Sequence, residues 1–153
     1  MAYLYAPRPS ITELPVFFNV DGVVGANPAQ NSREDVLLVQ FVFEIIAQQP
    51  RASTRPEVVA ACKPVKSTGV IDDSTINAIR VFQVDPKNKN VIVDGRVSPA
   101  RNGYSYGGGA AFTIVDLNNA LQDRFSDIWP RIDKVGSCPP EIRAMVKRTV
   151  AGE

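Results

Sequence analysis

Three stretches of the chain decide its expected fold: DVLLVQFVF at residues 35–43, GVIDDSTINAIRVFQ at 69–83 and VDGRVSP at 93–99. The first two are rich in apolar residues, and in the second these recur at helical spacing. The third contains an Asp-Gly pair, which is typical of a tight turn. The sequence therefore predicts helices joined by short turns.

The boundaries of the first two helices follow from capping residues and prolines. Ser32 is an N-cap candidate and Pro50 is a breaker, so a helix is expected over 33–49. Its apolar residues cover more than one face, which predicts a central position. A second helix is expected over 73–84, because an aspartate caps it and Asp85 and the following proline end it.

The other expected elements are short or lie further along the chain. They are a short edge strand within 11–20, a short helix over 56–62, a very short strand or extended piece at 91–93, a helix over 113–128 and a last helix over 140–150.

Composition excludes several classes of function. The 153 residues include 17 basic and 16 acidic ones, so the net charge of +1 provides no field for nucleic acid. There is no histidine, which excludes a Ser-His-Asp triad and removes the commonest zinc ligand. Cys62 and Cys138 either pair or are buried as apolar residues, and the sequence does not decide between these. We expect no enzyme activity, no metal and no cofactor.

The N-terminal segment MAYLYAPRP lacks the basic region and apolar stretch of a secretory signal. No segment reaches the roughly 18 uninterrupted apolar residues of a membrane span. We expect a protein made in the cytoplasm without a signal peptide and not inserted in a membrane. Delivery to the envelope or exterior would then require a phage particle or a secretion machine.

Several motifs occur in a characteristic order. They are Val24-Gly25-Ala-Asn27, Asp35-Val36, Val39-Gln40, Gly69-Val-Ile71, Thr75, Phe82-Gln83, Asp94-Gly95-Arg-Val97-Ser-Pro99 and Thr113. In this order they resemble the peptidoglycan-binding-domain family, a small helical module found beside cell-wall enzymes. The resemblance covers about residues 20–125. The threonine that should follow the third motif directly comes only at Thr113, after an inserted loop.

The resemblance implies an all-α fold, a small orthogonal three-helix bundle with an extended N-terminal arm and an extra C-terminal helix. The implied domain map places the arm at 1–19, the helical domain at 20–128 and the C-terminal extension at 129–153. Insertions absent from compact family members are expected at 50–68 and 100–112.

Most residues of the motifs are expected to hold the fold rather than to contact a ligand. The glutamines are expected to join loop carbonyls to helix ends through their amides. This structural set is Asp35, Gln40, Gly69, Thr75, Phe82, Gln83, Asp94 and Gly95.

A ligand groove for a glycan or stem peptide needs aromatic faces and polar donors. The best cluster in the sequence is Arg101, Asn102, Tyr104 and Tyr106, although a glycine-rich loop that merely carries two tyrosines explains these residues better. Trp129 either fills a helix junction or stacks on sugar. Asp123 and Asp127 are interpreted as a solvated helix face rather than as a catalytic pair.

Two functions follow as hypotheses. The first is a non-catalytic binding module that recognises peptidoglycan or a related cell-wall polymer. The second is a structural or adaptor protein that uses the same bundle to dock protein partners in a larger assembly, such as a phage or secretion-system particle. An exposed apolar patch at residues 3–5 would favour the adaptor.

Overall fold

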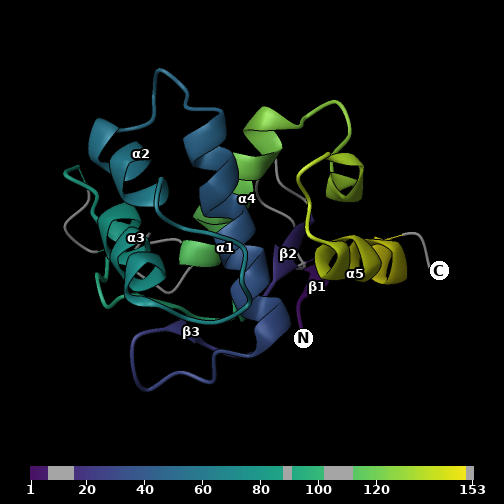
Figure 1. Cartoon of the computed structure of the whole chain (residues 1–153), viewed down its shortest axis with the longest axis horizontal. Coiled ribbons are helices and arrows are strands. Elements are labelled where there is room, and N and C mark those ends of the chain that lie inside the picture. The colour runs from purple at the N-terminus through teal and green to yellow at the C-terminus, as the bar shows by residue number, and fades with distance from the viewer. Residues whose placement is uncertain (7–15, 88–90, 102–111, 151–153) are drawn as a thin grey trace.

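The computed structural model describes residues 1–6, 16–87, 91–101 and 112–150. Their helices and strands are, in chain order, β1 (Tyr3–Tyr5), β2 (Phe17–Asn19), β3 (Val24–Gly25), α1 (Arg33–Gln48), α2 (Pro56–Cys62), α3 (Asp73–Gln83), β4 (Arg96–Val97), α4 (Thr113–Arg124), the 3₁₀-helix η1 (Ile132–Lys134) and α5 (Pro140–Val150). Helix α1 runs through the middle, with α2 and α3 on one side and β1, β2 and α5 on the other (Figure 1).

The central position expected for the first helix is confirmed. Every residue of α1 from Asp35 to Phe43 is buried, and Ile45 and Ile46 extend the buried surface. The helix packs against α2, α4, α5 and β3. A helix that is apolar on most of its circumference requires neighbours on several sides, and these four elements supply them.

The helix boundaries largely follow the local signals in the sequence. Helix α2 has the bounds expected for it, and α1 and α3 each end one residue earlier than expected. The carboxylate of Asp72 accepts a hydrogen bond from the Thr75 backbone N–H at 2.8 Å and so caps α3. Ser32 occupies the N-cap position of α1, but its side chain makes no capping hydrogen bond.

The all-α prediction is wrong. The described residues form five α-helices and two small antiparallel sheets, so the fold is mixed. In one sheet Leu4 of β1 lies opposite Phe18 of β2. In the other, Val24 of β3 lies opposite Val97 of β4. The strands that pair are two or three residues long, too short for an alternating pattern to show in the sequence. Of the two alternatives at 91–93, the short strand is not formed, and the pairing with β3 occurs at β4 instead.

Part of the segment expected as an extended N-terminal arm is paired and packed against the rest of the fold. Strand β1 pairs with β2 and packs against α5. Ala2, Phe17 and Phe18 are fully buried, and so are Ile142 and Met145 of α5. Side chains from all three segments of the expected domain map therefore share one hydrophobic core. Among the described residues, no helix is both long and apolar enough to span a bilayer.

Candidate functional site

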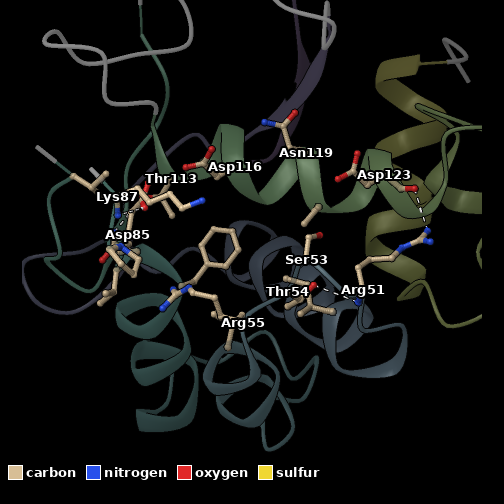
Figure 2. Close-up of a pocket in the computed structure, with 18 of the residues that line it drawn as sticks. Arg51, Ser53, Thr54, Arg55, Asp85, Lys87, Thr113, Asp116, Asn119 and Asp123 are labelled. Carbon is tan, nitrogen blue, oxygen red and sulfur yellow. Dashed lines mark hydrogen bonds between the residues drawn. The ribbon is translucent and has the colours of Figure 1, made fainter. Parts of the chain in front are cut away.

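A cleft of about 540 Å³ lies among three parts of the fold. They are one face of α4, the segment 51–55 that follows α1, and the C-terminal end of α3 with the turn after it. Figure 2 shows this cleft, with α4 along one side and the segment 51–55 facing it. Polar and apolar side chains contribute about equally to the wall. The ionised and polar ones include Arg51, Arg55, Arg124, Asp85, Lys87, Asp116, Asn119 and Asp123.

The helical spacing of α4 explains how it lines the cleft. Asp116, Asn119 and Asp123 follow one another at intervals of three and four residues and so lie on one face of the helix. The opposite side of α4 carries Ile114, Leu117 and other buried residues, which anchor the helix in the core. The packing of the apolar face of α4 in the core therefore fixes the position of its polar face, which lines the cleft.

Phe82 forms the apolar part of the cleft wall. It is only half buried, with Phe43 of α1 packed edge to face against it at a ring-centroid distance of 6.0 Å. Ile46, Val58 and Ala120 add further apolar surface around it. Apolar and aromatic surface combined with polar groups that can orient a ligand is typical of a binding pocket.

The end of α3 at the cleft is fixed by the Gln83 side chain. Its Oε1 accepts hydrogen bonds from the backbone N–H groups of Asp94 (3.2 Å) and Gly95 (3.0 Å). Its Nε2 donates to the Arg96 carbonyl at 2.8 Å and to the Thr113 hydroxyl at 3.1 Å. One buried amide thus joins α3, the 94–96 turn and the first residue of α4.

The side-chain amide of Gln40, in α1, makes the same kinds of hydrogen bonds as that of Gln83. Its Oε1 accepts from the N–H groups of Thr68 (3.0 Å) and Gly69 (2.9 Å). Its Nε2 donates to the Val70 carbonyl at 3.0 Å and to the Thr75 hydroxyl at 3.2 Å. The fold therefore contains two copies of a unit in which a helix glutamine binds a turn and a threonine that opens the next helix.

The remaining residues of the structural set also lie in the scaffold. Asp35 is fully buried and accepts hydrogen bonds from the N–H groups of Asp21 and Gly22. Gly69 and Gly95 have φ angles of +78° and +72°, the region that favours glycine. Each supplies an N–H group to one of the two glutamines.

The basic end of the cleft contains Arg51 and Arg124. Hydrogen bonds to backbone carbonyls hold both guanidinium groups: Arg51 donates to the Asp123 carbonyl at 3.1 Å, and Arg124 to that of Gln49 at 2.8 Å. Partial burial and the neighbouring Arg51 lower the pKa of Arg124. Within the described part of the chain, neither arginine forms a salt bridge.

The acidic end contains Asp116 and Asp85. Desolvation by the cleft walls, and secondarily the charge of Asp85, raise the pKa of Asp116 to about 6, although its side chain still has access to solvent. Within the described residues, neither carboxylate has a salt-bridge partner. The exposed Lys87 and the half-buried Arg55 lie at the same end, and Asp123 lies towards Arg51, so both ends of the cleft carry groups of both signs (Figure 2).

The raised pKa of Asp116 predicts a pH dependence of stability. The folded state holds the proton more tightly than the unfolded chain, whose carboxyl titrates near 3.8, so this group lowers stability as pH rises from 3.8 to about 6. We expect Asp116→Asn to raise the melting temperature more at about pH 7.5 than at about pH 4. Asp127→Asn, an exposed carboxyl outside the cleft, is the control. An Asp116→Asn effect of equal size at both pH values would contradict this account.

Both cysteines are free and buried, so the disulfide left open by the sequence is absent. Burial raises the pKa of the Cys62 thiol and that of the Cys138 thiol to about 12 each. We expect a thiol reagent at about pH 8 to label neither cysteine in the folded protein and both in denaturant. Rapid labelling of the folded protein would show that one thiol is accessible. Within the described residues, no three cysteine, aspartate or glutamate side chains lie together as a metal site would require.

Of the ligand residues expected from sequence, the structure describes only Arg101, which is exposed and does not line this cleft. Asn102, Tyr104 and Tyr106 lie outside the described residues. Trp129 packs edge to face against Phe18, at a centroid distance of 5.6 Å. Its buried Nε1 has no hydrogen-bond partner within the described part of the chain.

The sequence motifs include Phe82, Gln83 and Thr113, which line the cleft, but they do not indicate a binding role for them. Arg51 falls in the predicted insertion at 50–68, and Asp123 on the predicted solvated helix face. The spacing of Asp116, Asn119 and Asp123 was a usable signal, because it predicts three polar side chains on one face of a helix. The facing arginines could not be found in this way, since they are brought together only by the fold.

Comparison with known proteins identifies no relative: no protein-family model, curated protein or solved structure matches the chain.

Proposed function

We propose that the chain is a non-catalytic binding module for peptidoglycan or a related cell-wall polymer, and that the cleft between α4 and the segment 51–55 is its binding site. The single observation that carries the proposal is the composition of the cleft. An aromatic side chain, Phe82, lies among hydroxyl, amide and charged groups, the set that a polar polymer of sugars and short peptides requires.

The hydrogen bonds of Gln40 and Gln83 support this proposal. These two buried side chains hold turns and helix ends in fixed positions. Gln83 and Thr113 also line the cleft. Binding residues presented by a rigid scaffold lose less conformational entropy when a ligand binds. The motifs that resemble the peptidoglycan-binding-domain family include both glutamines.

Co-sedimentation of the purified chain with isolated peptidoglycan sacculi tests the proposal and locates the site. We expect saturable binding that the double variant Arg51→Gln/Asp85→Asn weakens. The alternative site is tested by Tyr104→Ala/Tyr106→Ala, which we expect to bind like the unmodified chain. Loss of binding only in the tyrosine variant would move the site to that loop. No binding by the unmodified chain would overturn the proposal.

The adaptor function is the second candidate, and its support differs from what the sequence suggested. Tyr3, Leu4 and Tyr5 are half buried in β1, between β2 and α5, so they do not form the expected exposed patch. Three other apolar side chains are exposed near the cleft: Val84 at 44%, Ile92 at 55% and Val93 at 48%. In this alternative they would dock a protein partner within a larger assembly, such as a phage or secretion-system particle.

A variant with polar residues at the two exposed positions outside the cleft wall separates the two functions. We expect Ile92→Thr/Val93→Thr to leave sacculus binding within about twofold, because neither side chain lines the cleft. The adaptor function predicts instead that the chain joins a protein assembly and that the double variant does not. The sacculus assay and analytical ultracentrifugation of each variant provide the two measurements.

A further inference from the structure

The guanidinium groups of Arg51 and Arg124, at one end of the cleft, keep hydrogen-bond donors that the protein does not use. A guanidinium group has five N–H donors in a fixed planar arrangement. Within the described residues, the Arg124 side chain makes three hydrogen bonds, to two backbone carbonyls and to the Thr54 hydroxyl. The Arg51 side chain makes one, from Nη2 to the Asp123 carbonyl at 3.1 Å. Both groups are therefore held in position and still have N–H donors available to a ligand.

The two guanidinium groups also lie close enough to repel each other. Partial burial lowers the pKa of Arg124 most, and the charge of Arg51 lowers it further. The Asp123 carboxylate has a smaller, opposite effect on the pKa of Arg124. Among the described residues, neither arginine forms a salt bridge, with Asp123 or with any other carboxylate. Two cations and one carboxylate leave this end of the cleft with an excess of positive charge.

The opposite end of the cleft has no such excess. Arg55 and Lys87 lie there together with Asp85 and Asp116 (Figure 2). The Arg55 guanidinium also forms a salt bridge with Glu57, at 2.8 Å. An anion is therefore expected to bind at the end that contains the other two arginines.

We propose that Arg51 and Arg124 form a binding site for a phosphate group, with the Ser53 and Thr54 hydroxyls beside them in the cleft wall. A phosphate group presents three strong acceptor oxygens, which paired N–H donors of guanidinium groups match in geometry. It can use more of the available donors than a carboxylate, which presents two oxygens. Because hydrogen bonds to backbone carbonyls already orient both guanidinium groups, little side-chain entropy is lost on binding.

This site goes beyond the proposed wall-binding function and does not depend on it. The phosphate group belongs either to a phosphodiester-linked polymer of the cell wall or to a small phosphate ester. Both present the same oxygens to the two arginines, so the chemistry of recognition is shared, and separate ligands distinguish the two sources.

Titration of the full chain with inorganic phosphate, followed by the NMR shifts of its backbone amides, tests the site. Sodium chloride keeps the ionic strength constant, so that screening does not change during the titration. We expect saturable shifts at residues 51–55 and 119–124. Arg51→Gln should weaken the affinity about three- to fivefold, because it removes one ion pair at an exposed position. Arg51→Lys keeps the charge but not the planar donors and should weaken it less.

Two further variants make the test specific. Asp123→Asn removes the opposing carboxylate and should strengthen phosphate binding about two- to threefold. Arg101→Gln is the matched control, because Arg101 is exposed and lies outside the cleft wall, and it should leave the affinity unchanged. The melting temperature of each variant shows whether the fold is retained.

Dimethyl phosphate and glycerol 3-phosphate identify the source of the phosphate group. Tighter binding of dimethyl phosphate, a diester, assigns the site to a phosphodiester-linked polymer. Tighter binding of glycerol 3-phosphate, a monoester, assigns it to a small phosphate ester. In either case the proposal requires that Arg51→Gln weakens the binding.

The remaining outcomes separate this proposal from the wall-binding function. Shifts that do not saturate, or affinities that Arg51→Gln and Arg101→Gln change equally, show a non-specific ionic effect and overturn the proposal. Sacculus binding without phosphate binding overturns the proposal and leaves wall binding intact. Phosphate binding with the expected pattern of variants but without sacculus binding supports the proposal and overturns the wall-binding function.

Discussion

Gly25→Ala is expected to lower the free energy of unfolding by about 3 kcal/mol or more. Gly25 has a φ of +127°, a conformation that residues with a side chain rarely adopt. An added Cβ would overlap the Gly95 carbonyl oxygen and lie 3.0 Å from the Arg96 Cα, both of them backbone atoms. Because β3 and β4 pair at this position, the clash cannot be relieved by a side-chain rotation.

Gly136→Ala is the matched control for that substitution. Gly136 is exposed, and an added Cβ would meet no atom within 4 Å. We expect its effect on unfolding in urea to stay within about 0.5 kcal/mol. Equal unfolding midpoints for the two variants would show that the close approach of β3 and β4 is not required for folding.

Gln83→Leu is expected to cost about 2–4 kcal/mol of stability. Gln83 is 5% exposed, and its removal leaves two turn N–H groups and the Arg96 carbonyl without their partner. Each unsatisfied buried group costs about 1–3 kcal/mol, and partial access of water to the turn reduces the sum. Gln40→Leu should behave similarly, since its amide makes the same set of contacts.

Asn77→Leu provides the comparison for the glutamine variants, because Asn77 is exposed and lies in α3, the helix that contains Gln83. We expect it to change stability by no more than about 0.5 kcal/mol. Denaturant titration of the three variants is the measurement. A Gln83→Leu variant as stable as Asn77→Leu would contradict the view that the two buried amides hold the turns.

The helices were predictable because their signals are local. Pro56 at the start of α2, Asp72 as the cap of α3 and Pro140 at the start of α5 mark ends that depend only on nearby residues. The central position of α1 was predictable from its apolar circumference. These features require no knowledge of which segments meet in space.

The sheets and the cleft were not predictable in this way, because both depend on segments far apart in the chain. Val24 pairs with Val97, and Gly25 with Arg96, although the sequence shows only a turn-rich segment and an Asp-Gly motif. Arg51 and Arg124 meet only because α4 packs against α1. Periodicity places a side chain on a face of its own helix, but it does not identify the segment opposite.

Binding to intact sacculi tests the central claim most directly. Increasing amounts of sacculi are added to a fixed concentration of the full chain, and the protein left in the supernatant is measured, with the Arg51→Gln/Asp85→Asn variant alongside. The account predicts saturable depletion by sacculi and a weaker curve for the variant. A chain that stays in the supernatant at every concentration would contradict it.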